Sequence, residues 1–398
     1  MSYLQETREA GREIFPDLAR AFALIGIGLV NVAIFSYPMM GGYSADGALT
    51  GADKWSYFAV NALFLMKSYT LFSFMFGVGF AYQIKAAERR GVGFAGRYWR
   101  RIIGLLVLGL LHVALLFQGD ILVIYALLGS LLYFFRNMEA SKLIRWGVIL
   151  YSVQILVVAL ASGAFILGMT FAPEAMAEQD EMNDELIEAS LQAFGAGSFG
   201  DAVAQRITDW FSVISFGLFM QGIGAMSFFI FGLAAVRMGT IADPSRPFWK
   251  RCRHLFLPIG VVGSAIGGWF MVNSEGGMMS TGAMLGMIFI VTFSPFSTAG
   301  YLGLIAKWAE KPEGGLKVFL ARGGTASLTA YLLQSLVFSL VFNNYGLGYY
   351  AEMSAAGTIL LALCVGFGSV AFSSLWRLAL PRGPMEILLR RWTYLGSR

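Results

Sequence analysis

Three polar side chains, His112, Gln118 and Asp120, interrupt the almost wholly apolar stretch LGLLHVALLFQGDILVIYALLG at residues 108–129. The 398-residue chain contains only two histidines, so a histidine in this stretch needs an explanation. A histidine can exchange a proton near neutral pH and could act as a base on a hydroxyl or amine acceptor. The alternative is a neutral His112 satisfied by a neighbouring helix, with Asp120 capping the start of the next helix. The residues alone leave both interpretations open.

The segment PDLARAFALIGIGLVN places Asp17 and Arg20 three residues apart, on one face of a helix. They could pair with each other, or Arg20 could hold an anionic head group or phosphate through two hydrogen bonds. A helix cap combined with a membrane anchor is the structural alternative. Asn31 lies about 17 Å deeper along the same helix, where a helix–helix hydrogen bond would account for it.

Two further segments carry small or polar residues at helical spacing. In LFSFMFGVGF, Ser73 and Gly77 are four residues apart, which favours close helix packing over ligand binding. In RGGTASLTAYLLQS, the residues at positions i, i+4 and i+8 form one polar stripe, with Gln334 beside it: they are Ser327, Tyr331 and Ser335. Such a stripe lines either a helix interface or a cavity.

The composition identifies the solvent in which these residues must be positioned. Hydrophobic residues make up 57% of the chain, charged residues 13%, and the mean hydropathy is +0.66. A soluble domain normally carries about 25% charged residues. The chain is therefore predicted to be an all-α, polytopic membrane bundle, since helices satisfy every backbone group inside lipid and the apolar runs lack the alternation of a barrel.

Ten apolar segments are expected to form transmembrane helices. They are 18–38, 56–82, 101–118, 120–135, 146–171, 210–236, 255–273, 280–305, 325–342 and 354–380. The runs 101–118 and 120–135 are short for full crossings. The turn between them, FQGD, is therefore predicted to lie below the external surface in a protein-lined, partly hydrated cavity.

The charge of the connecting segments predicts the orientation. Lys and Arg concentrate in 83–101, 136–145, 237–254, 306–322 and the C-terminal tail, whereas 172–209 is acidic. With ten spans, the basic segments and both termini fall on the cytoplasmic side. The net charge of +5 then reflects topology and does not predict a nucleic-acid partner. We expect a single transmembrane domain over residues 1–398, with a short amphipathic helix in the external segment 172–209.

The sequence contains no self-sufficient catalytic or metal-binding motif. Cys252 and Cys364 show no disulfide framework or metal-ligand spacing, and no metal site is predicted. Walker, HExxH and GxSxG patterns are absent from the sequence.

Five segments together resemble the YeiB-type family of bacterial inner-membrane proteins. They are PDLARAFALIGIGLVN, LFSFMFGVGF, RRIIGLLVLGLLHVALLFQGDILVIYALLG, SLTAYLLQS and RGPMEILLRRWTY, in order between residues 17 and 394. The hairpin in which His112 is followed by Gly-Asp-Ile-Leu and Tyr125 is the most specific of them. That family is in turn similar to the wider group of transmembrane acyltransferases.

The resemblance implies a multi-pass protein of the bacterial inner membrane that moves an acyl group from a cytoplasmic donor, commonly acetyl-CoA, to a sugar or similar acceptor. It implies that His112 is the catalytic base or acyl relay and that Asp120 orients it. The donor or substrate would meet residues at the cytoplasmic mouth and in the cavity: Asp17, Arg20, Asn31, Arg100, Arg101, Tyr125, Tyr331 and Gln334. No covalently bound cofactor is implied.

The sequence departs from the family pattern at Ala21, where the family usually has Gly, and in the late motif. There, Thr325 and Ala330 stand where the family usually has Arg and Asn. The loss of that arginine weakens the expectation that this region binds an anionic donor, unless Arg322 substitutes for it.

Three functions remain open from the sequence. The first is an acyltransferase with an arginine-rich cytoplasmic rim for a phosphate-bearing donor such as acetyl-CoA or another acyl-CoA. The second is a transporter of a small metabolite or lipid, in which the buried polar groups form a substrate or proton site. The third is a non-catalytic scaffold. Membrane lipids are expected partners in each case, and the oligomeric state is not predicted.

Overall fold

A computed structural model describes residues 13–39, 41–44, 49–274, 279–312 and 314–395, and every regular element within these ranges is a helix. The first half comprises α2 Ile14–Ser36, η1 Gly42–Ser44, α3 Gly51–Leu63, α4 Lys67–Arg89, α5 Ala95–Leu115, α6 Leu122–Leu132, η2 Tyr133–Phe135, α7 Ala140–Phe171, α8 Pro173–Ser190, η3 Leu191–Ala196 and α9 Phe199–Gly217. The second half comprises η4 Leu218–Gly222, α10 Ile223–Arg237, α11 Pro247–Arg251, η5 Cys252–Phe256, α12 Leu257–Val272, α13 Thr281–Glu310, α14 Gly315–Gly324, α15 Ser327–Phe342, α16 Ala355–Ala379 and α17 Pro384–Thr393.

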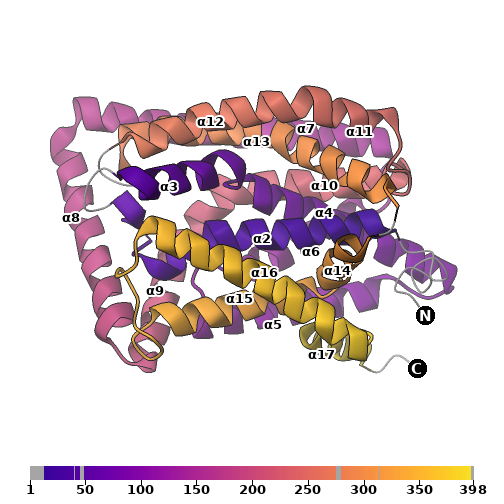
Figure 1. Ribbon diagram of the computed structural model, residues 1–398. Helices are drawn as coiled ribbons and strands as arrows, with labels where there is room; N and C mark the ends of the chain where they lie inside the picture. Colours follow the sequence, from indigo (N-terminus) through magenta and orange to yellow (C-terminus); the bar gives the residue numbers. More distant parts are fainter. Residues whose placement is uncertain (1–12, 40, 45–48, 275–278, 313, 396–398) are drawn as a thin grey trace.

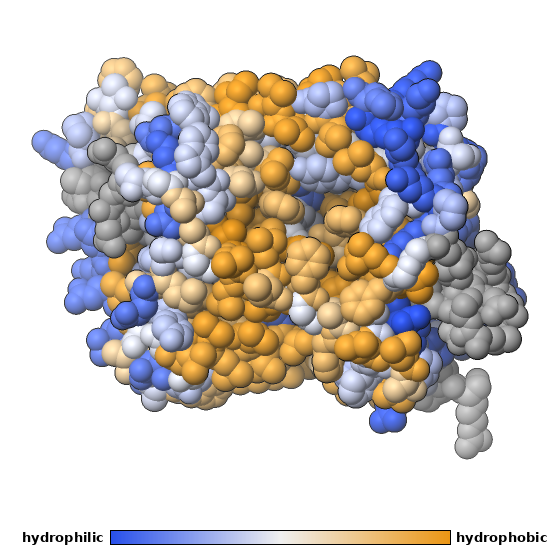
Figure 2. Space-filling model, in the orientation of Figure 1, coloured by the Kyte–Doolittle hydropathy of each residue, from blue (hydrophilic) through white to orange (hydrophobic). Residues whose placement is uncertain are grey.

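Most of the long helices run along a common direction, and α8 crosses them at one end of the bundle (Figure 1). Hydrophobic residues cover the middle of the visible face, and hydrophilic residues gather at its two ends (Figure 2). Leu156, Leu160 and Leu167 of α7 are each more than half exposed. A row of exposed leucines along a 32-residue helix is typical of a helix that faces lipid and not water. Together with the other long apolar helices, it shows that the chain is a polytopic helical membrane protein.

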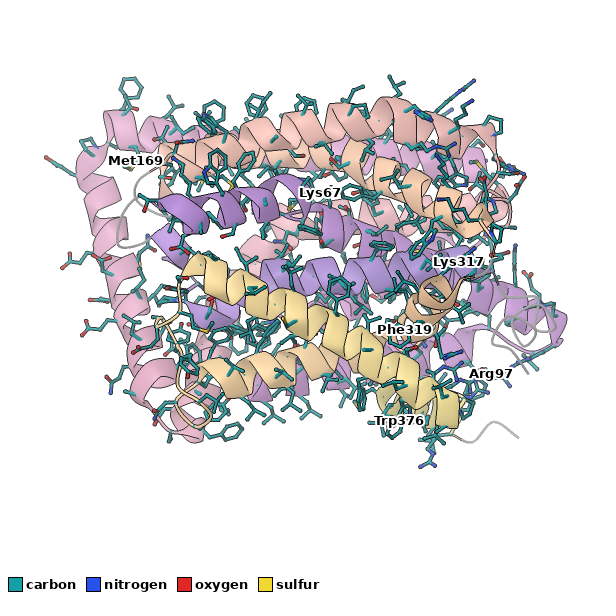
Figure 3. All side chains as sticks on the ribbon, in the orientation of Figure 1. Lys67, Arg97, Met169, Lys317, Phe319 and Trp376 are labelled. Atoms are coloured by element: carbon teal, nitrogen blue, oxygen red, sulfur yellow. The ribbon has the colours of Figure 1, made fainter. Side chains whose placement is uncertain are left out.

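The two ends of the bundle differ in charge. Figure 3 places Arg97, Lys317 and Trp376 at the end where α2 begins and α17 ends, and Met169 at the opposite end beside α8. We call the end where α2 begins and α17 ends the basic end. The second, where α8 carries exposed acids such as Glu181 and Glu185, we call the acidic end.

All ten expected apolar segments contain helix, but not all are long enough to cross a bilayer. Among the described residues, eight helices meet the length and hydropathy of a membrane span, or nine if the bent pair α14–α15 counts as one. The remaining expected span, α6 with η2, covers only Leu122–Phe135. Ten full spans is therefore an overcount, because an apolar run of this length reaches only about 20 Å as a helix.

The turn between α5 and α6 is buried, which agrees with the predicted protein cover. The partly hydrated cavity expected around it stays a prediction, because no residue of FQGD lines either cavity described for this structure. Phe117, Gln118 and Asp120 are all less than 5% exposed. Helix α9 covers this turn, and the guanidinium of Arg206 donates a hydrogen bond to the carbonyl of Leu115 at 3.2 Å. The α5–α6 hairpin therefore enters the bundle from the basic end and turns back beneath a protein layer.

Small residues bring α4 and α10 into backbone contact. A Cβ on Gly77 would lie 2.0 Å from the Phe229 carbonyl oxygen, and one on Gly232 would lie 2.1 Å from the Phe74 carbonyl oxygen. Only glycine fits at either position. The interpretation of Gly77 as a packing residue is confirmed, and this close contact fixes the helix that carries Ser73.

The segment 172–209 contains more helix than predicted. The expected amphipathic helix is present as α8, but the segment continues through η3 into α9. Ser198 and Asp201 form a capping box at the start of α9, since each side chain bonds the other's backbone N–H. This signal in the sequence, Ser followed three residues later by an acid, could have predicted the beginning of α9.

A sharp bend separates α14 from α15 and positions the polar stripe. The two helices meet at an angle of 83°. A Cβ on Gly324 would lie 2.0 Å from the Asp17 carbonyl oxygen, so α14 packs directly on α2. The backbone N–H groups that begin α15 donate to Glu386 from α17. The bend thus brings the start of α15 and its tyrosine next to the beginnings of α2 and α17.

Candidate functional site

A cavity of about 410 Å³ opens at the basic end of the bundle. Five arginines and one acid, Glu386, are the charged residues among those described as lining it. The arginines are Arg20, Arg101, Arg377, Arg382 and Arg390. Apolar side chains from α4, α5 and α6, including Phe72, Met75, Phe76, Leu105 and Leu122, form another part of the wall. The cavity therefore combines a cationic surface with an apolar one.

The guanidinium of Arg101 makes no hydrogen bond and no ion pair with any described residue, although it lines the cavity and is only partly exposed. Its neighbour in the cavity, Arg20, donates to Asp17 at 2.7 Å and so confirms the pairing that the i, i+3 spacing allows. A partly buried guanidinium without an anionic partner can hold a carboxylate or phosphate through charge-assisted hydrogen bonds.

Arg377 supplies a cation beside Thr325, the position at which the family motif usually carries arginine. Its Nε donates to the Thr325 hydroxyl at 2.9 Å, and the guanidinium lines the cavity. Arg322, the substitute suggested by the sequence, does not line the cavity. The cation is thus provided by α16, which no spacing rule within the motif could have predicted.

The one acid in the wall, Glu386, is already engaged by the fold. Oε1 accepts from the backbone N–H groups of Leu328 and Thr329 at 2.8 and 3.2 Å, and Oε2 accepts from the Thr329 hydroxyl at 2.6 Å. Negative charge at a helix N-terminus is stabilising. The Glu386 carboxylate therefore accepts hydrogen bonds from the start of α15. The five arginines determine the positive charge of the cavity wall.

Two tyrosines reach the cavity from the bundle interior. The hydroxyl of Tyr125 pairs with the Ser73 hydroxyl at 2.6 Å and donates to the Tyr69 carbonyl at 3.2 Å. Tyr331, on the stripe of α15, lines the cavity together with Ser327, whereas Ser335 instead bonds the carbonyl of Tyr331. The first half of the stripe therefore faces a cavity and the second half a helix interface.

His112 and Asp120 form a buried pair. His112 Nδ1 lies 2.7 Å from Asp120 Oδ2, while Asp120 Oδ1 accepts from the backbone N–H of Val123 at 2.8 Å. Asp120 thus caps α6, as the structural interpretation predicted, and also holds the imidazole. His112 Nε2 has no hydrogen-bond partner in the described residues. His112 is 3% exposed and does not line the cavity, but its ring lies 5.1 Å from that of Tyr331.

Three sequence-predicted residues lie apart from this group. Gln334 donates to the Leu24 carbonyl and to the Ser369 hydroxyl, so it joins α2, α15 and α16. Arg100 bonds the carbonyl of Leu395 and does not line the cavity. Asn31 is half-buried on α2 and is not part of the cavity wall.

Sequence reasoning missed two buried cations. Lys67, near the middle of the bundle in Figure 3, is 1% exposed and donates to the Asn61 carbonyl at 3.2 Å, which caps the end of α3. Arg206 is also 1% exposed and bonds Leu115, Ser339, Asn343 and Tyr345. Lys67 lies inside the expected span 56–82 and Arg206 lies just before the span 210–236, and a charged residue in or beside an apolar run is the signal that could have singled them out.

Comparisons with known proteins identify the family of this chain. The chain is 32% identical over 411 residues to the uncharacterized protein YxaH of Bacillus subtilis, covering 100% of this chain and 98% of that relative. A family model described as a protein of unknown function, DUF418, matches residues 235–396. The chain belongs to the DUF418 family.

The chain is also similar to two further proteins. The chain is 27% identical to the uncharacterized protein YeiB of Escherichia coli over 397 residues, covering 96% of each. It is also 37% identical over 136 residues to an uncharacterized 39.9 kDa protein of Bacillus acidopullulyticus, covering 34% of this chain and 37% of that relative. No solved structure is significantly similar to this chain. The YeiB-type resemblance is confirmed over the full length.

Proposed function

We propose that this protein is a membrane-embedded acyltransferase that accepts an acyl group from a CoA-type donor and transfers it to a sugar, lipid or small-metabolite acceptor. The observation that carries the proposal is the arginine-lined cavity at the basic end, whose wall includes Tyr331 in ring contact with the buried His112–Asp120 pair. Cationic and proton-handling groups thus belong to one connected site.

The orientation follows from the charge of the two ends. By the positive-inside rule, the basic end, where α2 begins and α17 ends, would face the cytoplasm, where acyl-CoA is found. With bacterial relatives, the membrane is taken to be the bacterial inner membrane. A donor would then enter the cavity directly from the cytoplasm, with membrane lipids surrounding the apolar belt.

The two kinds of cavity wall suit the two parts of such a donor. The phosphates would lie against Arg101 and its neighbouring arginines through charge-assisted hydrogen bonds. The uncharged arm and its thioester would lie along Phe72, Met75 and Phe76. An electropositive cavity also raises the local concentration of an anionic substrate.

A binding measurement with acetyl-CoA tests the donor. Purified protein in nanodiscs should bind acetyl-CoA, and Arg101→Gln should weaken binding by about tenfold or more, since a charge-assisted hydrogen bond contributes about 1.5–3 kcal/mol. Arg145→Gln, an exposed arginine outside the cavity, is the matched control and should bind as the wild type does. Equal affinity of Arg101→Gln and the wild type would exclude this donor site.

A transporter is the second candidate, favoured by the 83° break between α14 and α15 beside the cavity. Broken helices that present their N-termini to a central site are typical of secondary transporters. The two functions differ in their need for a donor. Flux of a metabolite into liposomes without acetyl-CoA would favour transport, whereas acetyl-CoA-dependent release of free CoA would favour transfer.

A further inference from the structure

Of the three residues Tyr331, His112 and Asp120, only Tyr331 lines the cavity, and the His112 ring packs against the Tyr331 ring. The two rings are in contact, with centroids 5.1 Å apart and planes at 52°. Phe117, which is fully buried, lies on the His112 ring at a centroid distance of 6.0 Å. A ligand in the cavity therefore meets the phenol before it meets the imidazole.

Both of these rings carry a buried polar atom without a hydrogen bond. The Tyr331 hydroxyl and His112 Nε2 each lack a partner among the described residues. The Ile121 backbone N–H approaches the Tyr331 hydroxyl from the Asp120–Ile121 turn. An unsatisfied buried polar atom costs about 1–3 kcal/mol, so two such atoms on touching rings need an explanation.

Tyr125 lines the same cavity, but unlike Tyr331 it has hydrogen-bond partners for its hydroxyl. Its hydroxyl is fully engaged by the Ser73 hydroxyl and the Tyr69 carbonyl, at 2.6 and 3.2 Å. Tyr331 has no equivalent partners. The contrast separates a hydroxyl that joins helices from a buried hydroxyl beside the same cavity that has no such partner.

We propose that Tyr331 is the catalytic residue that exchanges a proton with the acceptor, and that His112 and Asp120 act through it as positioning residues. This inference rests on the proposed acyltransferase function. The acceptor oxygen attacks the thioester carbonyl and forms the new C–O bond while its proton passes to the Tyr331 oxygen. Once a bound substrate brings the two unpartnered atoms within hydrogen-bond distance, the Tyr331 proton passes to His112 Nε2, and Asp120 stabilises the resulting imidazolium through Nδ1. As the C–S bond breaks, the proton returns through Tyr331 to the leaving thiolate.

Cysteine labelling tests the order of these groups without any assay of transfer. In a Cys252→Ser, Cys364→Ser background, Tyr331→Cys should react with a small membrane-impermeant methanethiosulfonate added at the basic end. His112→Cys should react at least tenfold more slowly. If His112→Cys reacts as fast as Tyr331→Cys, the ligand reaches the imidazole directly and the inference is wrong.

Kinetics with acetyl-CoA and a bacterial membrane extract test the proton transfer. Tyr331→Phe should lower kcat by about 10²-fold or more with little change in the KM for acetyl-CoA, since a general acid–base group contributes about 10²–10⁴-fold. His112→Gln, a change in a residue that acts through Tyr331, should likewise lower kcat with little change in the KM for acetyl-CoA. Tyr151→Phe removes a buried hydroxyl that bonds Ser294 away from the cavity and is the control for loss of structure.

The outcomes separate the two proposals. An active wild type whose Tyr331→Phe variant keeps its rate contradicts the role of Tyr331 and leaves the acyltransferase proposal standing. A wild type that folds but neither binds nor consumes acetyl-CoA contradicts the proposed function, and the transfer role of Tyr331 with it.

Discussion

Asp120 uses its two carboxylate oxygens for two different purposes. Oδ2 bonds His112 Nδ1 and Oδ1 caps the first turn of α6 through the Val123 N–H. A carboxylate only accepts hydrogen bonds, so Nδ1 must donate and Nε2 remains the acceptor on the ring. The functional and structural interpretations of this residue are therefore not alternatives. Substitutions can separate the two roles. Asparagine keeps an oxygen that can cap α6 but does not hold Nδ1 as a donor, and alanine keeps neither the cap nor the bond to His112.

We expect Asp120→Asn to lower acetyl-CoA-dependent activity by about 10²-fold or more with little loss of stability. The amide oxygen can still cap α6, but its NH₂ group would force the His112 proton onto Nε2. Asp120→Ala should lose the activity and also about 1–2 kcal/mol of stability through the lost cap. Thermal unfolding in detergent and release of free CoA measure the two effects. Equal stability of the two variants would contradict the capping role.

Asp209, on α9 outside the candidate spans, is a buried carboxyl whose ionisation the fold opposes. Burial raises its pKa from 3.8 to about 6, although Gln205 donates to Oδ1 at 2.7 Å and Arg206 acts in the opposite direction. The folded state holds the Asp209 proton more tightly than the unfolded chain does. The stabilisation that comes from the protonated Asp209 carboxyl is therefore complete below about pH 4. It is lost as the pH rises through about 6.

Asp209→Asn should therefore be more stable than the wild type at pH 7.5, by about 1–3 kcal/mol, and should approach it near pH 4. Thermal unfolding at several pH values measures the difference. Asp184→Asn, an exposed carboxyl on α8, is the control and should change little at any pH. A loss of stability in Asp209→Asn that is constant with pH would show that the carboxylate form is needed by the fold.

At the scale of elements, helix formation follows from the sequence, but helix length and bending do not. The ten apolar runs predicted ten helical regions, yet α6 ends after a short stretch and α14 meets α15 at 83°. The bend depends on contacts from outside the run, since Gly324 packs on the Asp17 carbonyl and Glu386 caps α15. Hydropathy within one segment contains no information about such partners.

The same reason limits prediction of the site. The pairing of Asp17 with Arg20 and of His112 with Asp120 is confirmed, because these partners are close in sequence. Arg377, Arg382 and Arg390 were assigned only to the basic tail. Arg377 reaches the cavity from the end of α16. Arg390 reaches it because α17 folds back against α5, where Trp392 donates to the Arg100 carbonyl at 2.8 Å. Long-range docking of this kind has no local signature.

Docking of α17 should depend on Glu386. Glu386→Ala removes three hydrogen bonds to the start of α15, and we expect faster trypsin cleavage after Arg382 and Arg390, with about 1–3 kcal/mol of lost stability. Limited proteolysis followed by mass spectrometry measures this. Glu139→Ala, which removes an exposed pair with Lys142 at 3.6 Å, is the control. Unchanged cleavage in Glu386→Ala would mean that α17 docks through its apolar contacts alone.

At the scale of the whole molecule, the cavity opens toward the basic end while the region around His112 is closed toward the acidic end. Phe117 stacks on Phe35 at a centroid distance of 4.0 Å, and Arg206 joins α9 to the ends of α5 and α15. Among the described residues, the cavity thus gives a ligand a direct route from the basic end. Under the proposed function, an acceptor from the other side needs this closed layer to open, so the orientation of the molecule decides which substrate arrives by which route.

The orientation can be measured with single cysteines at the two ends. In a Cys252→Ser, Cys364→Ser background, we expect Glu181→Cys on α8 to react with a bulky impermeant maleimide on intact cells. Arg90→Cys, at the end of α4, should react only in inverted membrane vesicles. Both side chains are exposed, so differences in labelling report the side of the membrane and not burial. The positive-inside rule requires this result because the basic segments lie at the end that carries Arg90. Labelling of Arg90→Cys on intact cells would place the arginine cavity outside the cytoplasm, where no acyl-CoA could reach Arg101.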